Sequence, residues 1–217
     1  LSLHDALPIS KLSERQVGLR LTLLRKLAYG PGADPHFPNT VQDLWLEVGF
    51  GAGEHLVWQA EHHPHVGLIG AEPYEMGVAK LLTKLEENRL NTVRIYEGDG
   101  RDILEALPDA TLGRFFLLFP DPWPTTRHHK RRFVSPTTLA ELARVLKRGS
   151  IFRFATDIED YANWTLARIL REPRFRFAPL RPGIWHDPYS GWVPTRYEEK
   201  ARLEGRSVSF YFEFERI

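Results

Sequence analysis

The chain has 217 residues, of which 42% are hydrophobic and 26% charged, a composition typical of a globular protein with a substantial core. Its formal net charge is only +1, so the charge of the whole molecule does not indicate nucleic-acid binding, and only a local cluster could. Cysteine is absent, which excludes disulfides, thiolate nucleophiles and cysteine zinc sites, and no apolar run approaches the roughly 20 residues that span a membrane.

The first 42 residues differ in pattern from the rest of the chain. Residues 1–10 fit nothing that follows, and we expect them to be a non-native scar. Residues 11–28 combine spaced apolar positions with five Lys and Arg and predict a peripheral helix. Residues 29–42 are rich in Gly and Pro and predict a linker, so that residues 43–217 form a single domain.

From residue 43 onward, short apolar runs alternate with helical patterns. The predicted strands are 44–48, 66–71, 93–96, 115–119 and 151–155, and the predicted helices are 54–62, 74–88, 101–107, 135–147 and 158–170. Gly149 follows the fourth helix as an expected stop signal. Strands that alternate with helices indicate an α/β protein with a mostly parallel sheet covered on both faces.

The tail of the chain changes to a period of two. Apolar and polar residues alternate over 208–215, which predicts an antiparallel C-terminal strand, with 175–180 as its candidate partner. Five parallel units followed by a terminal strand pair form the Rossmann-like, seven-stranded layout of class I methyltransferases. The sequence therefore predicts that fold class for residues 43–217.

A glycine-rich loop, GFGAG, joins the first strand to its helix. Gly49, Gly51 and Gly53 let the backbone approach a ligand, and the following helix start offers N–H groups. The dinucleotide fingerprint requires a glycine where this chain has Glu54, which disfavours a bound pyrophosphate. S-adenosylmethionine has no phosphate and carries a cationic sulfonium, so acidic surroundings suit it.

Acidic residues stand at the carboxyl ends of three successive predicted strands, where open α/β sheets bind their ligands. Glu72 follows the last loop glycine by about 20 residues, the usual place for a carboxylate that grips ribose hydroxyls. We expect Asp99 to meet the adenine amino group and Glu47 the amino acid end of the cofactor.

The run FPDPWPTTRHHKRR, from Phe119 to Arg132, joins an apolar strand end to a proline-stiffened turn and then to a basic arm. The turn holds Asp121 and Trp123 beside one another, and the cations behind it suit the phosphates of a nucleic acid. The alternative interpretation is a proline-rich loop followed by a solvated, charged helix start.

These motifs together closely resemble the bacterial tRNA (guanine-N7-)-methyltransferase family. The match is carried by LEVGFGAGEHL, IGAEP, EGDGRD, FPDPWPxxRHHKRR, FATD and PTRYEEK, in family order from Leu46 to Lys200. The resemblance implies an enzyme that transfers a methyl group from S-adenosyl-L-methionine to N7 of a tRNA guanosine, in the variable loop.

The resemblance also implies roles for individual residues. The cofactor would contact Glu47, Gly49, Gly51, Gly53, Glu72, Asp99, Gly100 and Asp121, and Asp121 would also be the active-site acid. The target guanosine would contact Thr125, Asp157, Thr195, Arg196, Tyr197 and Glu198. The RNA would contact Pro124, Arg127, His128, His129, Lys130, Arg131 and Arg132. The family usually has Lys at the position of Thr125, which cannot pair with a phosphate.

The chemistry of N7 methylation needs alignment rather than proton abstraction, because N7 carries an available lone pair. We therefore expect Asp121 to act by position and charge. Guanine N1–H and its amino group are adjacent donors, and one carboxylate can accept a hydrogen bond from both. Asp121, Asp157 and Glu198 are the candidates for this contact, and the sequence does not rank them.

Two other functions fit the pattern less well. An NAD(P)-linked oxidoreductase is disfavoured by Glu54 and by the lack of an evident Tyr-Lys pair, and a non-catalytic RNA-binding module is disfavoured by the four acids. Pro64 interrupts the histidines around it, so we expect no metal. We further expect tRNA but no membrane as partner, a monomer or homodimer, and a cytoplasmic location. Whether Trp123, Trp185, Tyr189 and Trp192 stack on RNA or pack inside stays open.

Overall fold

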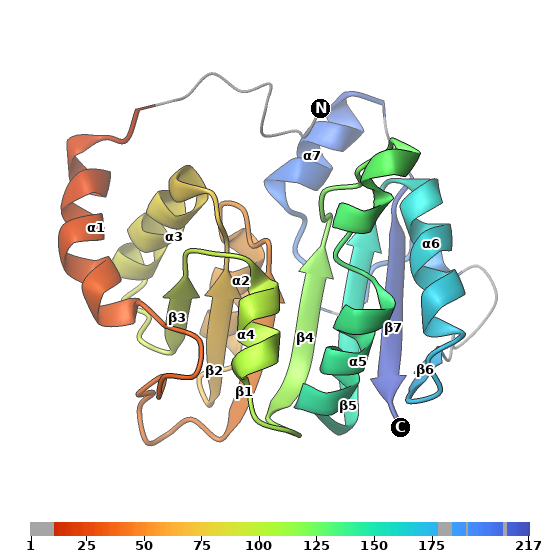
Figure 1. Ribbon diagram of the computed structural model, residues 1–217. Coiled ribbons are helices and arrows are strands. Elements are labelled where there is room, and N and C mark those ends of the chain that lie inside the picture. Colours follow the sequence, from red (N-terminus) through yellow and green to blue (C-terminus); the bar gives the residue numbers. More distant parts are fainter. Residues whose placement is uncertain (1–10, 178–183, 190, 206–207) are drawn as a thin grey trace. The chain divides into compact units, whose positions relative to one another are not determined.

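The computed structural model describes residues 11–177, 184–189, 191–205 and 208–217 (Figure 1). The chain forms two compact units, Ile9–Pro108 and Asp109–Ile217, which we call the N-terminal and the C-terminal unit. The expectations for residues 1–10 and 178–180 fall outside the described residues. Among the residues described, no helix has the length and apolar character needed to cross a membrane.

The N-terminal unit is built on parallel strands in the order β3, β2, β1 (Figure 1). They are β1 (Asp43–Val48), β2 (Val66–Ala71) and β3 (Val93–Tyr96). All of β2 is buried, as expected for a central strand with a continuous apolar sequence. Val48 pairs with Ala71 and Ala71 with Tyr96, so the three strands end at the same edge.

A helix follows each strand of this unit after a short loop. These helices are α2 (Glu54–His62), α3 (Glu75–Glu87) and α4 (Gly100–Ala106), and a further helix, α1 (Glu14–Leu27), precedes the sheet. The bounds of the first three agree with the predicted helices to within one residue at each end. The apolar face of α3 is buried, because Val78, Leu81, Leu82 and Leu85 recur at helical spacing.

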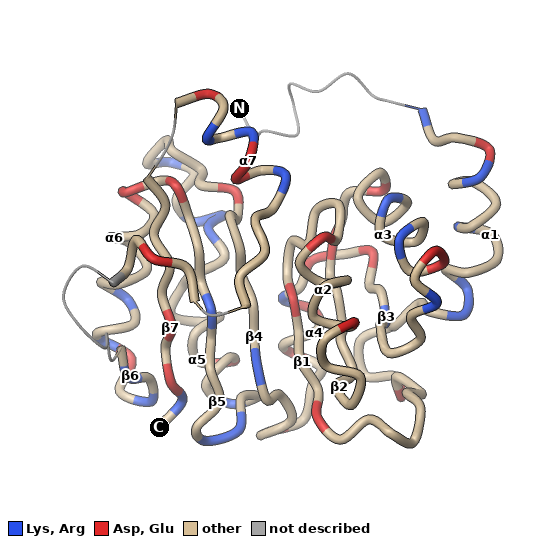
Figure 2. The backbone as a smooth tube through the Cα atoms, turned by 180° about the vertical axis from the view of Figure 1, so that it is seen from behind, with Lys and Arg blue, Asp and Glu red and all other residues tan. Residues whose placement is uncertain are grey.

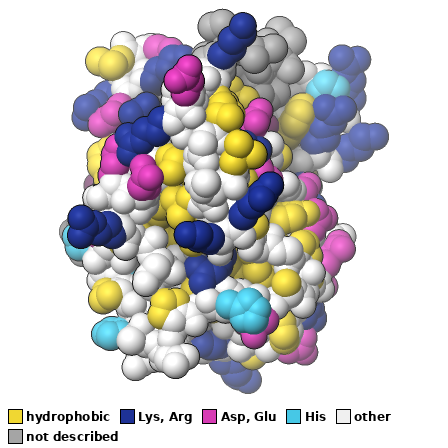
Figure 3. Space-filling model, turned by 90° about the vertical axis from the view of Figure 1, so that its left-hand side faces the viewer, with side chains coloured by type: hydrophobic (Ala, Val, Ile, Leu, Met, Phe, Trp, Pro, Cys, Tyr) yellow, Lys and Arg dark blue, Asp and Glu magenta, His cyan; other side chains and the backbone are white. Residues whose placement is uncertain are grey.

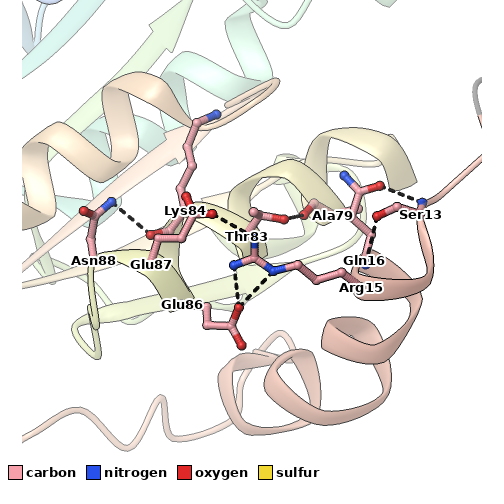
Figure 4. Close-up of polar contacts among 9 residues, drawn as sticks. All are labelled: Ser13, Arg15, Gln16, Ala79, Thr83, Lys84, Glu86, Glu87 and Asn88. Atoms are coloured by element: carbon pink, nitrogen blue, oxygen red, sulfur yellow. Dashed lines mark hydrogen bonds and ion pairs between the residues drawn. The ribbon is translucent and has the colours of Figure 1, made fainter.

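Helix α1 is attached to α3 by ion pairs. A capping box between Ser13 and Gln16 starts the helix, and Arg15 pairs with Glu86 at 2.7 Å and with Glu87 at 2.9 Å (Figure 4). Arg20 pairs with Glu97 at 2.8 Å. Basic and acidic side chains are interspersed over the face that carries α1 in Figure 1 (Figure 3).

The segment between α1 and β1 is anchored on the sheet rather than extended into solvent. The Tyr29 N–H donates to the Ile95 carbonyl at 2.8 Å. Arg94 donates to the carbonyls of Pro35 and His36 and lies 4.7 Å from the centre of the Phe37 ring. These contacts tie residues 29–42 to β3, although the segment contains no helix or strand of its own.

The C-terminal unit is built on a mixed arrangement of strands in the order β4, β5, β7, β6 (Figure 1). They are β4 (Leu112–Leu118), β5 (Leu146–Thr156), β6 (Phe175–Phe177) and β7 (Phe210–Arg216). Strands β4 and β5 are parallel, whereas β7 is antiparallel to both of its neighbours. The predicted antiparallel C-terminal strand is confirmed.

Phenylalanine fills the core of this unit. Buried rings from β4, β5 and β7 pack on one another, among them Phe115 on Phe152 at 5.2 Å and Phe154 on Phe212 at 6.1 Å. The surrounding elements are α5 (Pro136–Val145), α6 (Glu159–Ile169), α7 (Arg196–Leu203) and the short 3₁₀ helices η2 (Thr126–Arg131) and η3 (Ile184–His186). Acidic and basic residues alternate along α7 (Figure 2).

Two predictions about this unit are wrong in detail. The fourth helix ends at Val145 rather than near residue 147, and Gly149 lies within β5, not beyond a helix. Gly149 has a φ of 80° and sits at an irregularity in the pairing of β4 with β5, where a glycine relieves the strain of a bulge. The fourth strand ends at Leu118, because Phe119 turns into the left-handed region at a φ of 50°.

The described residues contain seven strands in total, mostly parallel, with helices between them and an antiparallel strand near the C-terminus. This is the fold class predicted from the sequence, and it is confirmed.

Candidate functional site

The glycine loop after β1 presents an open stretch of backbone. Gly49 and Gly51 have φ values of 73° and 56°, a region that side chains disfavour, and a Cβ on either would meet nothing within 4 Å. At Gly53 a Cβ would lie 2.6 Å from Leu81, because α3 passes close by. The loop is therefore fixed on one side by α3 and leaves space for a ligand against the backbone on the other.

Glu72 holds the middle of this loop. It directly follows β2 and is only 4% exposed, and its Oε2 accepts the Gly51 N–H at 2.9 Å. Its Oε1 accepts the Tyr74 N–H at 3.0 Å. A carboxylate has about four acceptor sites, so both oxygens can still accept ligand hydroxyls. The sequence-predicted cofactor residue thus lies directly at the glycine loop.

Glu47 is buried beneath the loop and contacts a residue that sequence reasoning missed. Its Oε2 lies 2.7 Å from His55 Nδ1, and the His55 Nε2 lies 3.0 Å from the Gln59 amide nitrogen. Glu47 and His55 are both 2% exposed. This chain of contacts joins β1 to the first turns of α2, directly behind the loop. The position of His55, eight residues after Glu47, carried no recognisable signal.

Asp99 lies at the same edge of the sheet, at the start of α4. Its carboxylate caps that helix by accepting the Arg101 N–H at 3.0 Å and pairs with the Arg101 guanidinium at 2.8 Å. Its side chain is 51% exposed, so it remains accessible to a ligand. A Cβ on Gly100 would lie 2.4 Å from Val48, which explains why α4 can begin so close to β1.

The residues of this edge fit S-adenosylmethionine. They offer an open glycine backbone and carboxylates for hydroxyl, amino and sulfonium groups. The nearby Lys84, also missed by sequence reasoning, is bound to the Ala52 carbonyl and pairs with Glu54 at 3.0 Å. Its charge is therefore matched, and its contacts hold the loop rather than offer a phosphate site.

The proline turn of the C-terminal unit follows β4 and is bent by two residues other than glycine. Phe119 and Trp123 have φ values of 50° and 42°, and they flank Pro120, Asp121 and Pro122. Such angles cost on the order of 1–3 kcal/mol per residue and persist only when the surroundings impose them. Asp121 is half-buried in this turn.

The basic arm forms η2, immediately after the turn. Pro124, Thr125, Arg127, Lys130 and Arg131 are exposed, and His128 and His129 are half-buried. Burial, followed by the charges of Arg127, Arg131 and Lys130, lowers the pKa of His128. The exposed part of the arm can meet phosphates.

Trp123 lies against this arm. Its ring is 4.7 Å from the Arg131 guanidinium and 6.0 Å from the His128 ring. Arg132 is placed differently, because it is only 1% exposed and points into the unit.

The segment around α7 gathers most of the predicted guanosine-binding residues. Thr195 caps the helix by accepting the Glu198 N–H at 3.2 Å. Tyr197 packs on Phe119 at 5.4 Å, and its hydroxyl lies 3.3 Å from both carboxylate oxygens of Asp157. Arg196, between Thr195 and Tyr197, is the first residue of α7.

Glu198 is held by two aromatic residues that sequence reasoning did not assign. Its Oε2 accepts the Trp192 Nε1–H at 2.9 Å, and its Oε1 accepts the Tyr211 hydroxyl. Burial and this carboxylate raise the pKa of Tyr211. A pocket of about 120 Å³ lies beside them. Trp192 therefore supports Glu198, while Tyr189 lies under the Arg153 guanidinium at 3.7 Å.

The histidines around Pro64 serve packing. His62 stacks on Trp58 at 4.0 Å, His63 packs on Trp45 at 4.8 Å, and His65 Nδ1 lies 3.3 Å from the Thr40 carbonyl. The described ranges contain no group of three or more His, Asp or Glu side chains arranged to hold a metal ion.

Comparison with known proteins relates most of the chain to methyltransferases. A family model described as "Putative methyltransferase" matches residues 41–211. A tRNA (guanine-N(7)-)-methyltransferase of a Caulobacter species is 48% identical over 205 residues, which cover 94% of this chain and 89% of the relative. One from a Ruegeria species is 53% identical over 175 residues, covering 81% of this chain and 68% of the relative.

Solved structures share the fold at low sequence identity. The 16S rRNA methyltransferase KamB superposes with a TM-score of 0.56 at 15% identity and covers 96% of both chains. An antibiotic-related methyltransferase superposes with a TM-score of 0.55 at 17% identity and covers 100% of both chains. These similarities establish the fold, whereas the sequence relatives establish the family.

Proposed function

This chain belongs to the tRNA (guanine-N(7)-)-methyltransferase family, and on that premise we propose that it transfers a methyl group from S-adenosylmethionine to N7 of a guanosine in tRNA. The resemblance noted in the sequence motifs is thereby confirmed. The observation that carries the proposal is the glycine loop, which has an open backbone and whose central Gly51 N–H donates to the Glu72 carboxylate. This arrangement suits a cationic, phosphate-free cofactor.

The cofactor, when bound, supplies an electrophilic methyl group on its sulfonium. We propose that Glu72 accepts the ribose hydroxyls and that Asp99 accepts the adenine amino group. Gly49, Gly51 and Gly53 leave room for the cofactor, and Gly100 keeps α4 close to the edge. We retain Glu47 as a candidate for contact with the amino acid end of the cofactor. Because Glu47 is buried against His55, we propose that it acts by positioning the first turn of α2 rather than by direct contact.

The base must be held rigidly, because the reaction needs N7, the methyl carbon and sulfur in line. Glu198 accepts from Trp192 and Tyr211, and both Asp157 oxygens lie at the Tyr197 hydroxyl, so Asp121, Asp157 and Glu198 all remain candidates for accepting guanine N1–H and its amino group. Carboxylates near the base also stabilise the positive charge that the methyl group brings to it. We propose that Glu198, Thr195 and Tyr197 position α7, with Arg196 at its start, against the guanosine.

The tRNA partner is proposed to lie along the exposed arm. Arg127, Lys130 and Arg131 would contact phosphates, and His128 and His129 would contribute weaker contacts. Pro124 and Thr125 begin this surface. By family resemblance the target guanosine lies in the variable loop. We also propose that the protein works in the cytoplasm as a monomer or homodimer.

The test is methyl transfer from labelled S-adenosylmethionine to unmodified tRNA, with the modified nucleoside identified by mass spectrometry. A matched tRNA carries 7-deazaguanosine at the variable-loop position, in which a C–H group replaces N7. We expect N7-methylguanosine with the first tRNA and no label at that position with the second. Label that persists on the 7-deaza tRNA would contradict N7 as the target, and label elsewhere would contradict the variable-loop site.

A further inference from the structure

Arg132 ends the basic run, yet its environment differs from that of the cations before it. Its side chain is 0% exposed, whereas Arg127, Lys130 and Arg131 lie on the surface. A buried guanidinium is costly unless its charge is paired. The contacts of Arg132 therefore show what it does.

These contacts lead to the proline turn on one side and to α6 on the other. The Arg132 Nε–H donates to the Pro122 carbonyl at 2.8 Å, directly after Asp121. Its Nη2 pairs with the Asp160 carboxylate in the first turn of α6. The guanidinium also lies 4.9 Å from the Tyr161 ring and 4.8 Å from the Trp164 ring.

The same face of α6 holds the chain on both sides of Arg132. The Tyr161 hydroxyl accepts the Phe133 N–H at 3.1 Å, and the Trp164 Nε1–H donates to the Val134 carbonyl at 2.8 Å. His129 packs edge-on against Trp164 at 5.1 Å and lies 3.8 Å from Asp160. The proline turn, η2 and the following chain are thus fixed to one helix face, with Arg132 at the centre.

We infer that Arg132 is a positioning residue that places Asp121 through the Pro122 carbonyl, with Asp160 orienting its guanidinium, and that it is not a phosphate contact. This inference rests on the proposed function. The requirement is for Arg rather than Lys, because a planar guanidinium can bond the carbonyl and the carboxylate through separate N–H groups while its face lies close to aromatic rings. A buried cation also releases no counterions from tRNA, so Arg132 adds nothing to the salt dependence of binding.

The test compares Arg132→Lys with Lys130→Ala, a matched control that removes an exposed cation from the same basic run. For each variant, kcat at saturating tRNA and tRNA affinity across a salt series are measured. We expect Arg132→Lys to lower kcat at least tenfold, and Arg132→Gln, which removes the charge, to keep the wild-type salt slope. Lys130→Ala, which removes a proposed phosphate contact, should flatten the slope by about one unit.

Asp160→Asn provides a second variant, because the Asp160 side chain is 64% exposed and its loss does not open the core. We expect it to lower kcat at least threefold with an unchanged salt slope. If Arg132→Lys does not fold, Asp160→Asn decides the question alone, and wild-type kcat in it overturns the inference. Wild-type kcat in Arg132→Lys, or a flattened slope in Arg132→Gln, also overturns it. A wild-type protein that methylates no tRNA contradicts the proposed function instead, a result visible before any variant is made.

Discussion

The glycine loop and the proline turn both follow a parallel strand and both carry functional residues, but they are held in opposite ways. The glycine loop adopts left-handed angles at Gly49, Gly51 and Gly53, which glycine does at little cost. The proline turn adopts such angles at Phe119 and Trp123, where they are costly. The backbone angles of the glycine loop therefore cost little in themselves, whereas those of the proline turn persist only because neighbours such as Arg132 and Tyr197 hold it.

The largest expected effect tests the glycine loop. Glu72→Ala should weaken S-adenosylhomocysteine binding by about 1.5–3 kcal/mol, the range for hydrogen bonds to a charged group. It should also lower the free energy of unfolding by about 1–3 kcal/mol, because the Gly51 and Tyr74 N–H groups would be left without their acceptor. Calorimetry and urea denaturation measure the two effects. Unchanged cofactor affinity would remove Glu72 from the site.

The next effect tests the proline turn. Asp121→Asn keeps the shape of the side chain and removes its charge, so the turn should persist while kcat falls at least about tenfold, or about 1.4 kcal/mol. Single-turnover kinetics with saturating tRNA and cofactor measure the chemical step. Wild-type turnover in this variant would show that the carboxylate charge is dispensable and that the turn serves only as a scaffold.

A smaller effect is expected from the arm beyond the turn. Replacing Lys130 and Arg131 together by Ala should flatten the salt dependence of tRNA binding by about one unit for each phosphate that is no longer paired with a cation. Cofactor affinity should stay at the wild-type value, since neither side chain is among the proposed cofactor contacts. An unaltered slope would identify the arm as a solvated surface and place the RNA path elsewhere.

At Thr125 a cation can be added instead of removed. This residue is exposed at the start of η2, where a Lys side chain has room to extend. We expect Thr125→Lys to raise kcat/KM for tRNA by about twofold to tenfold, because it adds a cation next to the turn. Thr125→Gln is the neutral control of similar length. Equal effects of the two changes would attribute the gain to size rather than charge.

The smallest effect concerns pH. Burial and the neighbouring cations lower the pKa of His128 in the protein without tRNA. Contact with a phosphate would raise that pKa, and binding would then take up a proton. We expect tRNA affinity to rise a few-fold as the pH falls through the pKa of the bound state, and His128→Gln to abolish that part of the dependence. An identical pH profile in His128→Gln would exclude a phosphate contact by His128.

Most of the fold was predictable because its signals are local. Apolar periodicity set α2, β2 and β3 at the predicted bounds, and the GFGAG loop lies where the strand-to-helix pattern placed it. The error at Gly149 has a local cause too, since one glycine can end a helix or relieve a bulge within a strand. Only the pairing of β4 with β5 distinguished the two.

Some features of the candidate site were likewise predictable from the sequence, and others were not. The sequence by itself determined which residue types occur at the strand ends, in the glycine loop and in the proline turn, because these follow from spacing along the chain. Only the tertiary structure decided that Glu47 faces His55, that Glu198 is held by Trp192 and Tyr211, and that Arg132 is buried. In sequence, the cations of the basic run look alike. Arg132 is buried because it contacts Asp160, which lies 28 residues further along the chain. Such burial depends on contacts between residues distant in sequence, so the sequence pattern does not reveal it.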